Sequence, residues 1–345
     1  MRLFATTLLC AFALLGFGRD RRDPPRGEAA SRRFNATLAV GTPYRRPSLP
    51  ASLSGIAWAG GMSYYAVSDD AFTNEVGLYP LTLELASNGL SVVSCKIPSS
   101  SRRIRLAEAY DLEDVAFDAV NGTVWAVDET RRTVKEYRLA DGAVLRTLKL
   151  PDFLRQDRSN LGMESLALGE DACTLWTCTE EALTCDGPRS SPAAGTTVRL
   201  LKFTRPDARG DFTLTGSYPY TTDAWSQAHD FDGKGRRGVS GLCALPDGSL
   251  LVLERELSFG GSNALTAATT ARLFFAVYRV DAASGAKEKL ASGGGRVFSF
   301  GNYEGICLGP HLTDGKRSVL LVSDSGDGMS PPCILPMVLS LAPHL

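Results

Sequence analysis

A hairpin pattern with acidic ends recurs five times along this chain, and it constrains the fold more than any other feature. The clearest copy covers residues 111–129 (DLEDVAFDAVNGTVWAVDE), where two short apolar runs flank an Asn-Gly pair. An Asn-Gly pair between two such runs is a strong signal of a β-hairpin turn. Because a hairpin reverses the chain, Glu113 at its start should lie at the same edge as Asp128 and Glu129 at its end.

The other copies have the same order of apolar strand, turn, apolar strand and polar or acidic end. Successive copies start roughly 50–75 residues apart, which leaves room for one four-stranded propeller blade and its loops in each interval. No long segment has the 3.6-residue periodicity of a helix. The remaining strand pairs are LSGIAW with YYAVSDD, MESLAL with LWTCTEE, VSGLCAL with SLLVLERE, and YEGICL with VLLVSDS.

These repeats predict an all-β protein, a five-bladed β-propeller that forms a single domain over residues 34–345. The fifth repeat has only three expected strands, and the alternating segment 34–40 is expected to supply the fourth. A ring closed by strands from both ends of the chain leaves no open sheet edge. Six blades are the alternative, because the long interval before the fourth repeat has room for an irregular one. Long loops are expected at 184–196, 219–238 and 257–271.

The first 33 residues are expected to lie outside this domain. Residues 1–18 combine Arg2, an apolar run and small residues before a charged stretch, which is the pattern of a secretory signal. The apolar run is too short for a stable membrane span. Residues 19–33 are charged and contain Pro, which favours a disordered leader. We therefore expect a secreted or periplasmic protein.

The charge of the chain indicates which partners to expect, and its cysteines indicate which disulfides are possible. With 37 basic and 38 acidic residues, the formal net charge is −1, and the arginine pairs are scattered, so we expect a monomer without a nucleic-acid partner. Export permits disulfides, and Cys173, Cys178 and Cys185 are close enough in sequence for one pair among them. Cys243 and Cys307 replace an Ala of the other repeats, and we interpret them as small buried side chains that pack between blades.

In a propeller the first strand of each blade lines the central channel, so the repeat places five strand starts around one mouth. With the acids at the second-strand ends, so many carboxylates cannot all stay ionised in water-poor surroundings unless a cation neutralises them. Oxygen ligands without His or Cys favour Ca²⁺ or Mg²⁺, and we expect Ca²⁺. Acids at strand ends also cap loops, which is the structural alternative for any one copy. The five strand starts are Ser54, Glu113, Glu164, Ser240 and Glu304.

We assign roles within this ring from residue type and position. Arg255 is expected to orient an anionic group, with a salt bridge to its neighbours Glu254 and Glu256 as the alternative. Neither a G-x-S-x-G motif nor a Gly-rich phosphate loop is present, so a hydrolase would rely on metal-activated water and acid–base carboxylates. The expected catalytic residues are Glu254, Arg255, Glu304 and Asp324. The expected metal ligands are Asp69, Glu113, Asp128, Glu164 and Glu181.

At these motifs the chain resembles the phytase-like propellers, a family described by the esterase-like activity of phytase. The resemblance rests on the five strand pairs above, including TEEALTCDG and SGLCALPDGSLLVLERE, and covers about residues 50–340. It implies a secreted or periplasmic β-propeller with a phosphoesterase-type activity. Ser54 and Ser240 depart from the Glu of the other copies, which leaves two gaps in the acidic ring. The recurring positions of the family match Glu113, Glu164, Glu181, Asp186, Glu254, Arg255, Glu304 and Asp324.

Three functions are compatible with this sequence. The leading hypothesis is a hydrolase that acts on a small anionic phosphoric or carboxylic ester at a Ca²⁺-binding channel mouth. The alternative is a non-catalytic propeller that binds an envelope ligand, glycan or protein through its long loops, since propellers host many functions. A metal-dependent lactonase is the third, and it needs a closely spaced Glu/Asp/Asn ligand set.

Overall fold

The computed structural model describes residues 36–45, 49, 52–69, 76–96, 103–158, 161–226, 234–261, 267, 269–325 and 329–341. Within these residues the chain forms strands β1 to β21 with almost no helix, which confirms the all-β prediction. The predicted signal segment 1–18 and the leader 19–33 lie outside the described residues.

Blades 1 to 4 are each built from four consecutive antiparallel strands. Blade 1 contains β3 (Leu53–Trp58), β4 (Ser63–Ser68), β5 (Gly77–Leu85) and β6 (Val92–Lys96). Blade 2 contains β7 (Leu112–Asp118), β8 (Thr123–Asp128), β9 (Thr133–Arg138) and β10 (Val144–Thr147). Blade 3 contains β11 (Met163–Leu168), β12 (Thr174–Thr179), β13 (Thr197–Thr204) and β14 (Thr213–Thr221). Blade 4 contains β15 (Lys234–Ala244), β16 (Leu250–Phe259), β17 (Arg272–Asp281) and β18 (Ala286–Arg296).

Blade 5 combines strands from both ends of the described chain. β19 (Asn302–His311), β20 (Arg317–Asp324) and β21 (Cys333–Leu341) follow one another, and β1 (Ala36–Val40) pairs with β21 as the outermost strand. The short β2 (Tyr44–Arg45) also pairs with β21. The five-bladed ring and its N-terminal closing strand are therefore confirmed, and the sheets of the described residues do not form a sixth blade.

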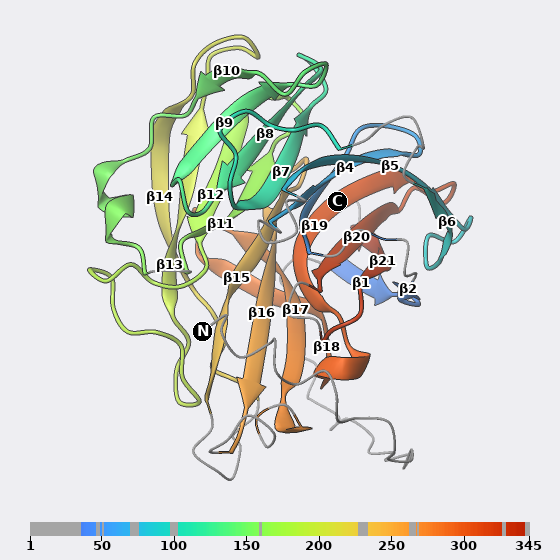
Figure 1. Cartoon of the computed structure of the whole chain (residues 1–345), viewed down its shortest axis with the longest axis vertical. Helices are drawn as coiled ribbons and strands as arrows, with labels where there is room; N and C mark the ends of the chain where they lie inside the picture. Colours follow the sequence, from blue (N-terminus) through green and yellow to red (C-terminus); the bar gives the residue numbers. More distant parts are fainter. Residues whose placement is uncertain are drawn as a thin grey trace.

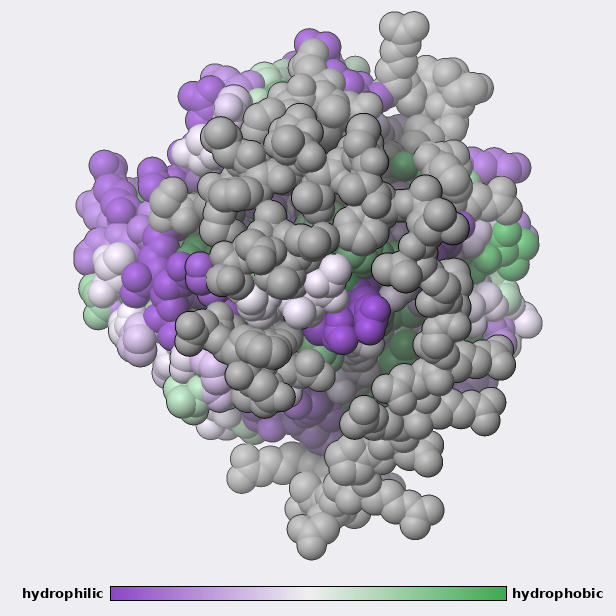
Figure 2. All heavy atoms as spheres, turned by 60° about the horizontal axis from the view of Figure 1, so that its bottom comes forward, coloured by the Kyte–Doolittle hydropathy of each residue, from purple (hydrophilic) through white to green (hydrophobic). Residues whose placement is uncertain are grey.

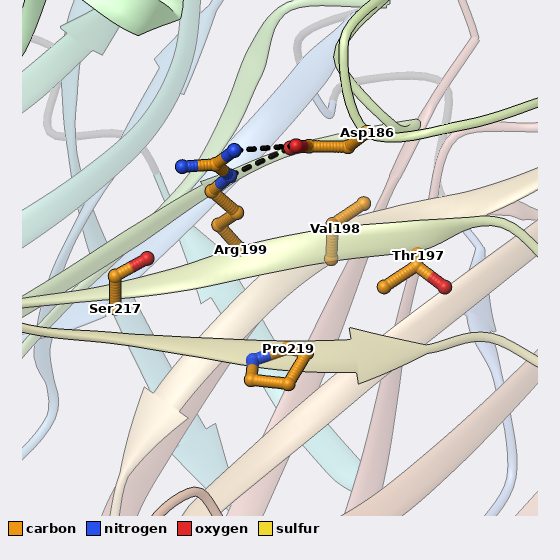
Figure 3. Close-up of a pocket in the computed structure, with 6 residues that line it drawn as sticks. All are labelled: Asp186, Thr197, Val198, Arg199, Ser217 and Pro219. Carbon is orange, nitrogen blue, oxygen red and sulfur yellow. Dashed lines mark hydrogen bonds and ion pairs between the residues drawn. The ribbon is translucent and has the colours of Figure 1, made fainter.

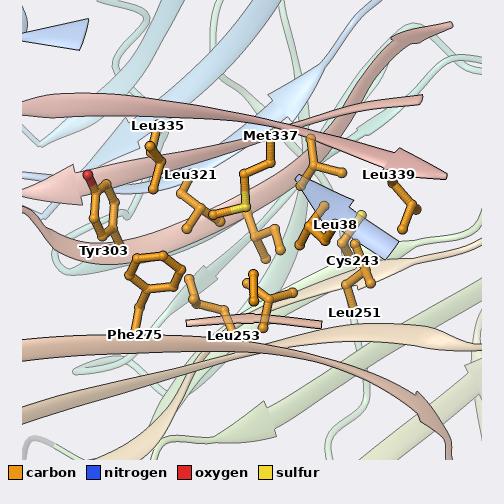
Figure 4. Packing of buried hydrophobic residues seen from close by; sticks show 14 of the residues in the cluster. Leu38, Cys243, Leu251, Leu253, Phe275, Tyr303, Leu321, Leu335, Met337 and Leu339 are labelled. Carbon is orange, nitrogen blue, oxygen red and sulfur yellow. The ribbon is translucent and has the colours of Figure 1, made fainter. Parts of the chain in front are cut away.

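The first strands of the blades form the inner wall of the ring. β3, β7, β11, β15 and β19 each contact the next, and β19 returns to β3, so the five sheets surround a common centre (Figure 1). One apolar cluster fills each interface between neighbouring blades. Figure 4 shows the cluster between blades 4 and 5, where Leu38 of β1 and Cys243 of β15 pack among residues of β16, β20 and β21. Cys307 belongs to the cluster between blades 5 and 1, so both cysteines are the small interblade side chains that their position predicted.

Adjacent inner strands approach so closely at one level that a side chain does not fit. A Cβ added to Gly305 would lie 2.8 Å from the Cα of Gly55 in the next blade, and a Cβ added to Gly55 would lie 2.5 Å from the Cα of Asp114. Both distances are far below normal carbon–carbon contact. Glycine is required here because neighbouring backbones touch.

Two of the predicted long loops are shorter than expected. β14 extends to Thr221, β15 begins at Lys234, and β16 continues to Phe259. Residues 234–238 pair with residues 255–259 and lengthen the hairpin of blade 4 at its acidic end. Their charged, glycine-containing sequence (KGRRG) lacks the apolar alternation of a strand, which is why it resembled a loop. The blade 4 strands extend beyond the ring in Figure 1.

All seven described cysteines are free, so the expected pair among Cys173, Cys178 and Cys185 is wrong. Cys173 and Cys178 lie at opposite ends of β12, on the order of 16 Å apart along an extended strand, too far for a disulfide.

In the face shown in Figure 2 the described surface is largely hydrophilic. No helix among the described residues is long and apolar enough to cross a membrane.

The closing strand generates a prediction about stability. Leu38→Ala should lower the free energy of unfolding by about 2–4 kcal/mol, because the buried side chain leaves a cavity in the cluster between blades 4 and 5. Denaturant titration of the variant checks this value. Thr37→Ala on the exposed face of the same strand is the control and should change it by at most about 1 kcal/mol. Equal effects of the two substitutions would show that β1 does not seal the ring.

Candidate functional site

Each inner strand contains a β-bulge at the same place. The pairing of the first and second strands of every blade shifts register across one extra residue. A bulge re-aims the side chain of the extra residue and is frequent next to active sites. All five side chains are buried. The extra residues are Ser54, Glu113, Glu164, Ser240 and Glu304, the five strand starts predicted to line the channel mouth.

The three bulge glutamates belong to a group of charged side chains that we call the central carboxylate cluster. Its members are joined by ion pairs or raise and lower one another's pKa. Carboxyl groups greatly outnumber guanidinium groups in it. The carboxyl groups are those of Asp69, Asp111, Glu113, Glu129, Glu164, Glu180, Glu304 and Asp324, and the guanidinium groups are those of Arg236 and Arg255.

Arg255 links two other blades across the centre. One of its terminal nitrogens lies 2.5 Å from a carboxylate oxygen of Glu180 in blade 3, and the other binds Glu304 in blade 5. Successive side chains of a strand point to opposite faces, so Glu254 and Glu256 point away from Arg255. The predicted alternative, a salt bridge to these two neighbours, is therefore not formed.

The charges of the paired carboxylates respond to these contacts. Burial opposes ionisation of Glu180, but Arg236, 3.3 Å away, and Arg255 outweigh it and lower the pKa of Glu180. Burial raises the pKa of Glu304 well above its ordinary value, Arg255 opposes this rise, and Asp324 adds to it. Glu304 also accepts a 2.9 Å hydrogen bond from the side-chain amide of Asn302.

Glu113 has no such compensation, and Glu164 has only the attraction of Arg255, without an ion pair. Their residues are only 7 % and 6 % exposed, and neither carboxylate has a hydrogen bond or ion pair with another described residue. Burial, followed by repulsion from Glu164, Asp69 and Asp111, raises the pKa of Glu113 well above its ordinary value. Burial, followed by repulsion from Glu180 and Glu129, raises the pKa of Glu164 well above its ordinary value, although Arg255 opposes the rise. A buried carboxylate without an ion-pair partner is costly. Glu113 and Glu164 therefore either carry protons or need a cation that the described residues do not supply.

Glu129 lies at the same centre and titrates in the physiological range. Burial raises its pKa to about 7, although the backbone N–H of Gly162 donates a 2.6 Å hydrogen bond that favours the charged form. Repulsion from Asp111 and Glu180 adds to the rise. A carboxyl group with this pKa can exchange a proton at neutral pH.

Three carboxylates lie close enough together to hold a cation. One oxygen from each of Asp69, Asp111 and Glu113 lies within 4.8 Å of the others. Such an all-oxygen set suits Ca²⁺ or Mg²⁺ better than zinc. The side-chain oxygen of Asn302, whose amide nitrogen binds Glu304, is also buried and receives no hydrogen bond from the described residues. The Glu113 carboxylate and this oxygen are acceptors without a donor among the described residues. They fit a bound cation or a bound ligand that donates hydrogen bonds.

Asp128, Glu181 and Glu254 were predicted site residues, but the carboxylate of each binds hydrogen-bond donors of the protein itself. Asp128 accepts hydrogen bonds from the backbone N–H groups of Tyr110 (2.6 Å) and Arg131 (2.8 Å), as a loop-capping acid does. Glu181 pairs with Arg189 at 2.8 Å and lies outside the central cluster. These two residues have the structural role that was the alternative for any single copy.

Glu254 is also surrounded by internal donors. It accepts hydrogen bonds from the hydroxyl of Tyr220 at 2.6 Å, from Arg237 at 2.7 Å and from Lys287 at 2.8 Å. Asp186, a recurring position of the resembling family, forms two bonds with Arg199 beside a shallow pocket of about 200 Å³ on blade 3 (Figure 3). The side chains of Glu254 and Asp186 form no ion pair with Arg255.

The sequence prediction did not include Asp111 among the candidate ligands. Asp111 precedes the apolar run of its hairpin, where it resembles a turn residue, but its carboxylate lies close to that of Glu113. The structure thus brings together Asp69, Glu113, Glu164, Arg255, Glu304 and Asp324 of the predicted set.

Comparison with known proteins assigns the family. A family model described as "Phytase-like: Esterase-like activity of phytase" matches residues 51–326. This chain belongs to the phytase-like family. Comparison of this phytase-like propeller with curated proteins finds no match.

Solved structures similar to this phytase-like propeller are remote. The PQQ-bound aldose sugar dehydrogenase of Streptomyces coelicolor is 14 % identical, with 88 % of this chain and 98 % of that chain covered and a TM-score of 0.44. A putative 6-phosphogluconolactonase of Bacteroides uniformis is 11 % identical, with 87 % and 95 % covered and a TM-score of 0.37. Kuenenia stuttgartiensis hydrazine synthase is 11 % identical at a TM-score of 0.35, with 81 % of this chain but only 59 % of that chain covered.

The burial of Glu164 predicts a pH-dependent stability. Its raised pKa in the folded protein favours protonation, so stability is full below the pKa of the unfolded chain and falls as pH rises through the folded value. Glu164→Gln imitates the protonated group. In the presence of chelator it should raise the free energy of unfolding by about 1–3 kcal/mol at mildly alkaline pH, and the gain should vanish near pH 4.

Denaturant titrations across this pH range measure the effect. Asp211→Asn, on an exposed loop, is the control for loss of one negative charge and should give a small, pH-independent change. A Glu164→Gln variant that loses stability at alkaline pH would mean that the ionised carboxylate has a partner in the fold.

Proposed function

We propose that this phytase-like propeller is a Ca²⁺-dependent hydrolase of small anionic phosphoric or carboxylic esters that acts at the central carboxylate cluster. One observation carries the proposal: Asp69, Asp111 and Glu113 converge within 4.8 Å although Glu113 is buried without a protein cation. A site that only stabilised the fold would give Glu113 a donor from the protein, as the fold does for Asp128, Glu181 and Glu254.

The chemistry divides among the chain's own residues. Asp69, Asp111 and Glu113 would hold the cation, which when bound supplies positive charge to polarise an ester oxygen. Arg255 is fixed by Glu180 and Glu304, so its guanidinium is already oriented and can recognise an anionic substrate without losing side-chain freedom. Glu164, held protonated by burial, can donate a proton to the leaving oxygen. Glu129, with a pKa of about 7, can accept one from water.

The assigned cation site makes a prediction about Ca²⁺ affinity. Glu113→Gln should weaken Ca²⁺ binding by at least about tenfold, because loss of even an outer-shell partner costs about 10–100-fold at metal sites. Isothermal titration with Ca²⁺ after chelator treatment measures the change. Asp141→Asn, which removes a charge from an exposed turn, should leave the affinity unchanged. Wild-type protein that binds no Ca²⁺ would remove the cation from the proposal.

Turnover tests the proposal as a whole. The purified protein should hydrolyse phytate, p-nitrophenyl phosphate or p-nitrophenyl acetate, and chelator should abolish the activity until Ca²⁺ is restored. Absence of chelator-sensitive turnover on all three would overturn the proposal. Ca²⁺ binding without any turnover would favour the non-catalytic binding propeller.

Arg255 provides a test of substrate class. Arg255→Lys keeps the charge that Glu180 and Glu304 require but loses the planar two-pronged donor geometry. Its kcat/KM should fall about tenfold or more for p-nitrophenyl phosphate and much less for the uncharged p-nitrophenyl acetate. Equal losses on both substrates would show that Arg255 positions the cluster and does not bind the anion.

A further inference from the structure

The end of the ring opposite the central carboxylate cluster contains a separate cavity of about 440 Å³. The same inner strands line it, but with the residues that follow the bulges. Along β3, Trp58 of the cavity lies four positions after the bulge residue Ser54, on the order of 13 Å away. The level where Gly305 meets Gly55, and Gly55 meets Asp114, lies between the two sites. This cavity is therefore distinct from the proposed ester site.

Its walls are mostly apolar. Each blade contributes equivalent apolar residues from its inner strand, and a small alanine or cysteine occupies the next position. Pockets of this size, apolar with a few polar groups, are the usual form of small-molecule sites. The innermost apolar residues are Ile56, Val115, Leu166, Leu242 and Ile306.

One charged side chain crosses the opening. Arg317 of β20 is only 9 % exposed and is the only Lys or Arg among the described residues that line the cavity. Its guanidinium carbon lies 5.0 Å from the centre of the Trp58 ring in blade 1. One of its terminal nitrogens binds Glu170 of blade 3 at 2.9 Å, and the other lies 2.7 Å from the imidazole Nε2 of His311. Arg317 thus reaches from blade 5 to blades 1 and 3.

Glu170 differs from the buried partners of Arg255. Its side chain is 54 % exposed, so it can turn into solvent without leaving a buried charge of its own. Arg317 cannot move as freely, because its Nε also donates a 2.5 Å hydrogen bond to the carbonyl oxygen of Gly309 and its guanidinium packs against Trp58. The fixed guanidinium therefore presents a carboxylate-binding position that an exchangeable side chain of the protein occupies.

We propose that this cavity binds an amphiphilic monocarboxylate, whose apolar tail lies among the inner-strand residues and whose carboxylate replaces Glu170 on Arg317. Charge complementarity sets this choice of ligand. An uncharged apolar molecule would fill the same space but would not use Arg317, and a dianion would place a second charge against the apolar wall.

Octanoate and 1-octanol, which share a tail and differ in the head group, test the proposal on the full chain by isothermal titration. Octanoate should bind at least about tenfold more tightly than octanol, a difference of about 1.4 kcal/mol. Arg317→Gln should remove this preference. Glu170→Gln, at a half-exposed position that the fold tolerates, should strengthen octanoate binding several-fold and leave octanol unchanged, because it removes the internal competitor.

Two further variants locate the ligand. Ala244→Phe places a ring in the cavity and should weaken both ligands, whereas Glu113→Gln at the other end of the ring should affect neither. The proposal is overturned if octanoate does not bind, if octanol binds equally well, or if Glu170→Gln weakens octanoate. Because the readout is binding and not turnover, these results are independent of whether the ester site is active.

Discussion

The contact between neighbouring inner strands is the constraint from which the rest of this structure follows. Where Gly305 meets Gly55 and Gly55 meets Asp114, the backbones leave no space for a side chain. In all five blades the residue that precedes this level is the bulge residue. The close approach of the strands and the inward placement of Glu113, Glu164 and Glu304 thus occur at adjacent positions of the inner strands.

That geometry concentrates negative charge where water is scarce. Arg255 and Arg236 offset part of it, and they do so across blades, so the ion pairs also tie blade 4 to blades 3 and 5. Breaking such a buried pair leaves an uncompensated charge, which typically costs about 3–5 kcal/mol. The carboxylates that remain unpaired make this cluster electrostatically unfavourable. A protein retains such a site when a ligand returns the lost stability, which is the usual relation between function and local stability.

Much of the fold was readable from the sequence because the repeat combines three signals. Apolar runs, turn residues and acidic ends recur together, and the three strands of the last repeat required a fourth from residues 34–40. The lengthened hairpin at 234–238 was not readable, because its strand character comes from pairing with 255–259 and not from its own alternation. The expected cysteine pair failed for a related reason: proximity in sequence along an extended strand is separation in space.

The candidate site was readable only in part. Sequence position placed Glu113, Glu164 and Glu304 at the centre, because equivalent positions of a repeat lie around one axis. It did not separate Glu254 from Arg255, which occupy opposite faces of β16 and therefore have different partners. It also could not show which acids find donors in the fold. Asp128 and Glu181 have the same residue type and position as a ligand would, and only the neighbouring backbone amides or Arg189 decide their role.

The pairing of β1 with β21 has a consequence for biosynthesis. β1 is translated before the other strands, but its partner β21 is translated last. The side chain of Leu38 therefore stays uncovered while almost the whole domain is translated. Ring closure is then the final event of folding. If a second chain is nearby at that moment, its waiting strand can take the vacant edge, and two molecules would exchange their first strands to form an interlocked pair.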